Sequence, residues 1–268
     1  MIAPLGRALI LIGLLAASAG AFVGFAAAAR RSAAGLAWAQ RLAYLYAGAM
    51  ISANLLMIYA LLARDFSVGY VAQVGSRDVP NWVAVTSLWS SLEGSILFWG
   101  LVLGLYVLGA TWVNRNRHPE TMPWAIGVWL ACAAFFSFLI AGPAQPFHTL
   151  AVPPSDGPGP NPLLQNHLLM IIHPPFLYAG YVGMTIPFGM AAAALFAGRL
   201  GPEFMRSLRT WLMLPWVFLT VAIVFARNDV RQGRLAQPRR AKQQHMIERL
   251  PARARRLNKD RSWPRIFS

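Results

Sequence analysis

Long apolar runs separated by short polar stretches make up the first 226 residues of the chain. A helix needs about 20 mostly apolar residues to cross the hydrocarbon core of a bilayer. Six segments meet this requirement, and they lie near 8–29, 42–63, 94–113, 122–141, 166–196 and 209–226. The pattern therefore predicts an all-α fold, a polytopic transmembrane helical bundle of about six spans.

Composition agrees with a membrane protein and separates the chain into two parts. Of the 268 residues, 57% are hydrophobic and 12% are charged, whereas soluble domains carry about 25% charged residues. Residues 1–226 hold 11 basic and 6 acidic residues, and residues 227–268 hold 13 basic and 3 acidic residues. Because the second part also lacks apolar periodicity, we expect 1–226 to be the transmembrane part and 227–268 a disordered basic tail unrelated to it.

The charges of the connecting loops predict an orientation. The first, third and fifth loops carry eight arginines, and the second and fourth carry two. By the positive-inside rule the odd loops face the cytoplasm. The N-terminus and the loops 64–93 and 142–165 then face outward, and the tail would emerge there as well. No nucleic-acid partner is expected for the tail on that side of a membrane.

The single cysteine excludes several functions. Cys132 lies inside an apolar run, and the chain has no C-x-x-C or C-x-x-C-H sequence. The protein therefore cannot perform dithiol exchange alone and is not itself a c-type cytochrome. We interpret Cys132 as a packing residue.

The most informative residue is His173, which Pro174 and Pro175 follow within a long apolar run. Ionisable side chains at membrane depth are costly and are usually functional. The two prolines remove backbone donors and are expected to break the helix beside the histidine. If the helix begins near Leu164, His173 lies near the bilayer middle, and if it begins at Pro174, His173 lies near the outer surface.

Two roles for His173 follow from its chemistry. A lone histidine cannot complete a zinc site, but haem iron needs only one or two axial ligands and apolar, aromatic walls. Trp99, Tyr178 and Tyr181 could supply such walls. Alternatively, the imidazole is structural and satisfies backbone groups that the prolines free. The other histidines are expected to be solvated; they are His118, His148, His167 and His245.

Glu93 is the second candidate, at the start of the third span and beside several serines. A carboxylate at a helix start complements the helix dipole. Alternatively, it serves on the propionate side of a haem or as a proton relay. No Ser/His/Asp triad, phosphate loop or metal cluster is visible, so no catalytic residue is assigned.

Three motifs in order, and a fourth segment that is similar too, carry a resemblance to a known family. They are residues 89–99 (WSSLEGSILFW), 161–166 (NPLLQN), 173–183 (HPPFLYAGYVG) and 65–71 (DFSVGYV). On these motifs, the chain resembles the CcmF/NrfE family from its N-terminus to about Val224. CcmF is the large membrane subunit of the bacterial cytochrome c maturation haem lyase, in the inner membrane.

The resemblance implies a function, partners and a cofactor. The family takes haem from the haem chaperone CcmE and, with CcmH-type thioreductase subunits, joins it to apocytochrome c. It also holds a haem b between two transmembrane histidines, and the resemblance makes His173 one of these axial ligands. Tyr178, Tyr181, Trp99 and Glu93 would then belong to the cofactor site, and membrane lipid would surround the bundle.

The chain also departs from the family. The family continues past the sixth span into a Trp-rich haem-handling segment and further spans that supply the second ligand. Here the sequence after Phe225 resembles nothing in the family, and we interpret it as an out-of-frame tail. We therefore expect an impaired haem lyase subunit without the segment for the lyase step. The alternatives are a non-catalytic membrane scaffold of the maturation complex and a haem transporter.

Overall fold

A computed structural model describes residues 1–162, 164, 168–198 and 201–231, with side chains as far as Arg227. The chain divides into two compact units, Met1–Ala222 and Ile223–Ser268. The described part of the second unit continues a helix to Arg231, so most of the predicted tail lies outside the described residues. The paragraphs below concern the first unit and the helices that form it.

Helices account for nearly all regular structure in the described residues. The long helices in chain order are α1 (Ile2–Arg30), α2 (Ala33–Ala63), α5 (Leu92–Val113), α6 (Met122–Leu139), α8 (Leu168–Gly183), α9 (Thr185–Ala197) and α10 (Pro202–Arg231). The short ones are α3 (Gly69–Val74), α4 (Asn81–Thr86), the 3-10 turn η1 (Ser87–Trp89) and the π-helical turn η2 (Ile140–Ala144). Six helical segments are long and apolar enough to cross a membrane, with α8 and α9 joined as the fifth. The predicted six-span bundle is thereby confirmed, and the chain is a multi-pass membrane protein.

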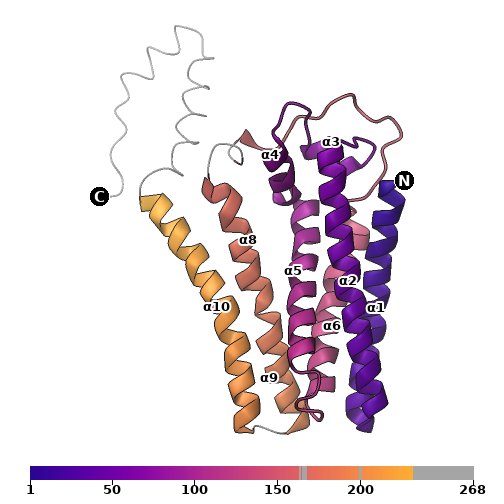
Figure 1. Ribbon diagram of the computed structural model, residues 1–268, viewed down its shortest axis with the longest axis vertical. Coiled ribbons are helices and arrows are strands. Elements are labelled where there is room, and N and C mark those ends of the chain that lie inside the picture. The colour runs from indigo at the N-terminus through magenta and orange to yellow at the C-terminus, as the bar shows by residue number, and fades with distance from the viewer. Residues whose placement is uncertain (163, 165–167, 199–200, 232–268) are drawn as a thin grey trace, which may run out of the picture. The chain divides into compact units, whose positions relative to one another are not determined.

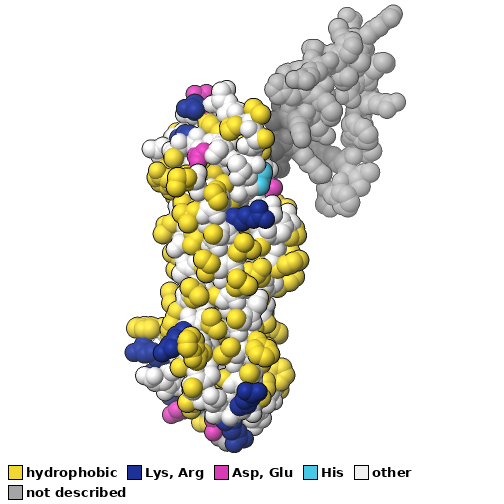
Figure 2. All heavy atoms as spheres, turned by 90° about the vertical axis from the view of Figure 1, so that its right-hand side faces the viewer, with side chains coloured by type: hydrophobic (Ala, Val, Ile, Leu, Met, Phe, Trp, Pro, Cys, Tyr) yellow, Lys and Arg dark blue, Asp and Glu magenta, His cyan; other side chains and the backbone are white. Residues whose placement is uncertain are grey.

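The centre of the bundle consists of α1, α2, α5 and α6, which run side by side in Figure 1. Small residues let these helices approach closely, as is usual where helices pack in lipid. A Cβ atom on Gly24 of α1 would lie only 2.9 Å from the Cα of Gly127 on α6. Figure 2 shows hydrophobic side chains over most of one face, with arginines toward its upper and lower parts.

Two hydrogen bonds attach the fifth span to this centre. Tyr106 on α5 donates its hydroxyl to the carbonyl oxygen of Ala179 on α8 at 2.9 Å. Trp129 on α6 donates its indole N–H to the carbonyl oxygen of Ile186 on α9 at 3.0 Å. Since no water satisfies these groups in the hydrocarbon region, each bond fixes the position of its helix.

The two loops predicted to face outward lie at one end of the bundle and are joined to each other. The backbone N–H of Gly69 donates to the carbonyl oxygen of His148 at 2.8 Å, and Val68 and Thr149 form an isolated antiparallel bridge. Farther along, the backbone N–H of Arg77 donates to Oδ1 of Asp156 at 2.9 Å. The loops therefore form one connected layer over the ends of α2, α5 and α6.

Candidate functional site

The helix that carries His173 continues through both prolines. Helix α8 runs from Leu168 to Gly183 with Pro174 and Pro175 inside it, so the expected break beside the histidine is wrong. The break in the fifth span falls instead at Met184, between α8 and α9. Pro187 explains it, because a proline has no N–H for the carbonyl four residues earlier, which here belongs to Gly183.

The His173 ring forms a hydrogen bond to another helix. Its Nδ1 lies 3.1 Å from the carbonyl oxygen of Ala222 on α10. A carbonyl oxygen can only accept, so Nδ1 carries the proton and Nε2 is the nitrogen with a lone pair in the neutral ring. The bond ends on α10 and not on a carbonyl that the prolines free within α8. The bond fixes the tautomer of the ring. In metal-binding histidines, the nitrogen that does not bind the metal usually donates its N–H to an acceptor in the same way.

The face of α8 that carries His173 packs closely against α10. Phe176, three residues after His173, lies against Phe218 with 5.6 Å between ring centroids. A Cβ on Gly180 would lie only 2.6 Å from the backbone nitrogen of Leu219. Residues three and four apart share a helix face, so His173, Phe176 and Gly180 form one contact surface.

The predicted aromatic residues meet on another side of α8. Trp99 of α5 lies 5.4 Å from Tyr178 and 6.4 Å from Tyr181, measured between ring centroids. The Tyr178 hydroxyl donates to Oγ of Ser95 at 3.4 Å. Trp99 and Tyr178 are half-buried, whereas Tyr181 is 66% exposed. The cluster therefore holds α8 against α5 and leaves one ring open at the surface.

The structure does not gather the predicted site residues around one point. His173 and Tyr178 are five residues apart, which places them about 140° apart around the helix. Among the described residues, no hydrogen bond or ring contact joins His173 to Trp99, Tyr178 or Tyr181. Two surfaces thus lie on α8: the histidine toward α10 and the aromatic cluster toward α5.

Glu93 lies in the first turn of α5, where its charge complements the helix dipole. The hydroxyl of Ser91, the residue that caps this helix, donates to its Oε2 at 3.2 Å. The neighbouring turn is tightly packed because Gly94 has no side chain: a Cβ there would overlap the carbonyl oxygen of Leu88 and the hydroxyl of Tyr70. Glu93 itself is half-buried.

Two ionisable groups near the outer loops have shifted pKa values. The backbone N–H of Arg77, together with that of Gly157 and the Ser76 hydroxyl, lowers the pKa of Asp156 below its ordinary value. Burial raises the pKa of the Tyr70 phenol, whose oxygen lies 2.7 Å from the carbonyl oxygen of Ser87. Both groups therefore support the loop layer in the charge state that is usual near neutral pH.

The other histidines are distributed over the molecule. His148 is exposed in the outer loop layer, and its Nδ1 lies 2.9 Å from the carbonyl oxygen of Gln145. His118 is half-buried and packs edge-on against Phe204. His167 and His245 lie outside the described residues. Within the described ranges, no three histidine, cysteine or carboxylate side chains could hold a metal ion as a group.

Sequence reasoning missed the polar groups inside the bundle. Asn54 of α2 is buried and donates to the carbonyl oxygen of Leu97 on α5 at 3.1 Å. The indole nitrogens of Trp89 and Trp99 are buried without a hydrogen-bond acceptor among the described residues. An asparagine in the middle of an apolar run was the signal that could have identified Asn54. The two tryptophans lie near span ends, where an interfacial position is the usual interpretation, so their buried indole nitrogens left no signal in the sequence.

Comparison with known proteins identifies the family. The family described as "Cytochrome C assembly protein" matches residues 89–225. The cytochrome c-type biogenesis protein CcmF of Escherichia coli is 33% identical over 197 residues, which are 73% of this chain and 30% of that protein. The biogenesis protein NrfE of Haemophilus influenzae is 32% identical over 68% of this chain and 29% of its own length.

A solved structure agrees with these relatives. The structure of the cytochrome c haem lyase CcmF matches with a TM-score of 0.73 and 32% identity, over 83% of this chain and 35% of the other. The chain spans less than a third of the length of the curated relatives that it matches. The resemblance predicted from the sequence motifs is confirmed: the chain belongs to the CcmF family of cytochrome c assembly proteins, of which it matches the N-terminal portion.

Proposed function

We propose that this chain is a membrane haem-handling factor for the assembly of c-type cytochromes, with Nε2 of His173 as an axial ligand to haem iron. The observation that carries the proposal is the 3.1 Å contact between His173 Nδ1 and the carbonyl oxygen of Ala222. Haem iron takes its axial ligands from side chains such as histidine. A backbone acceptor on the second nitrogen orients the ring and raises its basicity as a ligand.

The position of His173 supports a haem near the outer-loop end of the bundle. His173 is five residues after Leu168, which is roughly 7.5 Å along the axis of α8. In Figure 1 this end of α8 lies on the same side of the bundle as α3 and α4. Of the two depths that the sequence left open, the shallow one therefore fits better, although the helix does not begin at Pro174.

The residues present suit one half of a bis-histidine haem site. The donor set is a single imidazole with its tautomer fixed, so this chain would supply one axial ligand of a haem b. Haem held there would be the resident haem b and would supply a redox-active iron, separate from the haem that the assembly reaction transfers. In this proposal Trp99, Tyr178 and Tyr181 hold α8 in place from the α5 side, and Glu93 fixes the start of α5.

The wider role follows from the family and is proposed on that ground. The relatives are named for cytochrome c-type biogenesis. We propose that the chain receives haem from the chaperone CcmE and acts with CcmH-type subunits on apocytochrome c, in the bacterial inner membrane. The arginines of the first, third and fifth loops support an N-terminus on the periplasmic side.

The visible spectrum of the chain tests the haem ligand. The detergent-purified protein is mixed with one equivalent of haemin, washed and reduced. We expect a Soret band that His173→Ala abolishes, while His118→Ala keeps it, because His118 packs against Phe204. Added imidazole should restore the band to His173→Gly, since it replaces the missing ligand without repairing the chain.

A scaffold that binds no haem is the second candidate. The observation in its favour is that the His173 bond to Ala222 also joins α8 to α10 and so has a structural value of its own. In that case neither the original chain nor His118→Ala takes up haem, while His173→Ala lowers thermal stability. Unchanged haem uptake by His173→Ala would contradict the proposed ligand directly.

A further inference from the structure

A pocket of about 640 Å³ lies between the end of α5 and the start of α10. Its lining comes from the last residue of α5, from residues 116–118 of the loop that follows, and from the first turns of α10. In Figure 1 the end of α5 and the start of α10 lie at the end of the bundle opposite α3 and α4. The volume is within the range of roughly 300–1,000 Å³ that is typical of small-molecule sites.

Two contacts hold the loop after α5 against α10. The ring of His118 packs edge-on against Phe204, with 5.4 Å between ring centroids. The Ser207 hydroxyl donates to Oδ1 of Asn114 at 3.2 Å. The Nδ2 group of Asn114 in turn donates to the carbonyl oxygen of Ala110 on α5 at 2.8 Å. The walls of the pocket are therefore joined to each other and are not two independent surfaces.

The side of the pocket toward the membrane interior is apolar. Trp211 is half-buried and reaches across to α5, because a Cβ on Gly109 would lie 3.5 Å from Cη2 of its indole ring. Val113, one turn after Gly109 on α5, is 44% exposed. Tryptophan side chains near span ends usually lie at the membrane interface. A ligand in this pocket can therefore contact both an apolar surface and the polar loop.

The side of the pocket toward water carries an excess of positive charge. Arg117 of the loop and Arg206 of α10 both line it, and both are exposed. Among the residues that the structure describes, neither guanidinium group has a hydrogen bond, an ion pair or a ring contact. The neighbouring Arg115, by contrast, lies over the ring of Trp112. The lining includes one carboxylate, Glu203, so the two arginines outnumber it.

We propose that this pocket binds the headgroup of an anionic phospholipid, with its phosphate between Arg117 and Arg206. The fork of donors on a guanidinium group matches two oxygens of a phosphate. The acyl chains would pass Trp211 and Val113 into the hydrocarbon region. In the proposed orientation this end of the bundle faces the cytoplasm, where basic pockets between membrane helices bind lipid headgroups. The proposal depends on α5 and α10 and not on haem binding.

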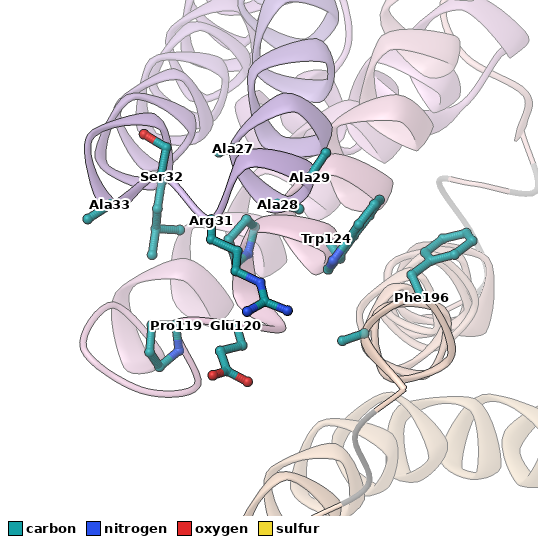
Figure 3. Close-up of a pocket in the computed structure, with 13 residues that line it drawn as sticks. Ala27, Ala28, Ala29, Arg31, Ser32, Ala33, Pro119, Glu120, Trp124 and Phe196 are labelled. Carbon is teal, nitrogen blue, oxygen red and sulfur yellow. The ribbon is translucent and has the colours of Figure 1, made fainter.

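A second pocket at the same end of the bundle has a different charge balance. It has a volume of about 410 Å³. Figure 3 shows Arg31 and Glu120 on one side of it and Trp124 and Phe196 on the other. It therefore contains one guanidinium group and one carboxylate, and it lacks the excess of positive charge that favours an anionic headgroup. Substitution of Arg31 thus serves as a control at a similar place in the bundle.

Native mass spectrometry of the delipidated full chain tests the proposal, with phosphatidylglycerol and phosphatidylcholine of equal acyl length as probes. We expect one phosphatidylglycerol per chain, preferred over phosphatidylcholine. Arg117→Gln and Arg206→Gln should each weaken it about tenfold, as expected for loss of a charge-assisted hydrogen bond. Glu203→Gln should strengthen it, because a like charge leaves the pocket.

Two controls remove the same charge outside the pocket and should leave phosphatidylglycerol binding almost unchanged. They are Arg209→Gln, three residues farther along α10, and Arg31→Gln in the pocket of Figure 3. Inorganic phosphate in large excess separates a lipid site from a site for free phosphate. It should not displace the lipid, since it has no apolar part to place against Trp211.

Three results would overturn the proposal. They are equal binding of both lipids, an equal loss in Arg206→Gln and Arg209→Gln, and displacement of the lipid by inorganic phosphate. Circular dichroism of each variant shows whether its helices remain intact. If an arginine variant loses helicity, Glu203→Gln still decides, because a gain in lipid binding cannot come from a loss of structure. Unchanged or weaker binding by a folded Glu203→Gln would then contradict the site.

Discussion

The hydroxyl of Tyr106 on α5 donates to the carbonyl oxygen of Ala179 on α8 at 2.9 Å, within the apolar part of the bundle. Its acceptor lies six residues beyond His173, and the bond holds α8 against α5. Tyr106→Phe keeps the ring and removes only the hydroxyl. We expect it to lower the free energy of unfolding by about 1 kcal/mol, in line with interhelical hydrogen bonds in membranes.

Unfolding of Tyr106→Phe in mixed detergent, followed by circular dichroism, measures this loss. Tyr59→Phe on α2 is the control, because that ring is exposed on the surface of the bundle and should change stability little. If both variants unfold at the same detergent fraction as the original chain, the bond to Ala179 contributes nothing.

The close approach of α8 to α10 depends on Gly180. A methyl group there would lie 2.6 Å from the backbone nitrogen of Leu219, so Gly180→Ala must separate the helices. We expect a loss of about 1–3 kcal/mol of unfolding free energy, as for other overpacked contacts. Gly48→Ala on α2 meets nothing within 4 Å and should be neutral or stabilising by up to about 1 kcal/mol.

The same Gly180→Ala variant tests whether helix spacing controls the ligand. Separation of α8 from α10 also lengthens the contact between His173 and Ala222, so haem uptake should fall while Gly48→Ala keeps it. Undiminished haem uptake together with reduced stability would separate the histidine from the packing of α10.

Asp156 should make the outer loop layer sensitive to acid. Its pKa is lowered in the folded state by the backbone N–H of Arg77 and other donors. A carboxylate with a lowered folded pKa stabilises above its unfolded pKa, and that stabilisation is lost as pH falls through the folded value. The loops should therefore be held together at neutral pH and loosen only below the ordinary value of 3.8.

Hydrogen exchange at the Arg77 amide, corrected for its intrinsic pH dependence, measures this opening. In Asp156→Asn this amide should exchange faster at pH 7 and lose the dependence on acid, while Asp78→Asn, on the loop of Arg77, keeps it. Equal protection of the Arg77 amide in Asp156→Asn and the original chain would exclude this role.

Gly69 and His148 form a pair that a double substitution can test. A Cβ on Gly69 would overlap the imidazole of His148, so Gly69→Ala should displace that ring and weaken the contact between the two outer loops. The amide of Leu150, which donates to the carbonyl oxygen of Ser67 at 3.1 Å, should then exchange faster. His148→Ala added to Gly69→Ala removes the overlap and should restore protection. Persistent fast exchange in the double variant would show that Gly69→Ala acts through the backbone at residue 69 and not through overlap with the His148 ring.

The spans could be predicted from the sequence because they depend on one quantity, the length of apolar chain needed to cross a bilayer. The course of α8 could not. Two adjacent prolines normally end a helix in water, but in a membrane bundle neighbouring groups can satisfy the freed carbonyls. Which neighbours are present is a property of the packed structure, so Pro174 and Pro175 lie inside a continuous helix.

The candidate site was likewise predictable only in part. The motifs identified His173, Trp99 and Tyr178 as notable residues, and Trp99 does contact Tyr178. The sequence could not tell which face of α8 each residue occupies, because that depends on where the helix begins and which helix lies beside it. The acceptor for His173 Nδ1 is a backbone carbonyl, and a carbonyl leaves no trace in a side-chain motif.

Helix α10 has a consequence for any ligand that His173 holds. Only 11% of the most apolar stretch of this helix is buried, against 39–50% in the other five spans. The helix that orients the imidazole is therefore the one that the rest of the bundle restrains least. If His173 binds haem iron as we propose, a partner that shifts α10 would move the carbonyl that orients the imidazole, so haem binding would respond to contacts outside the site.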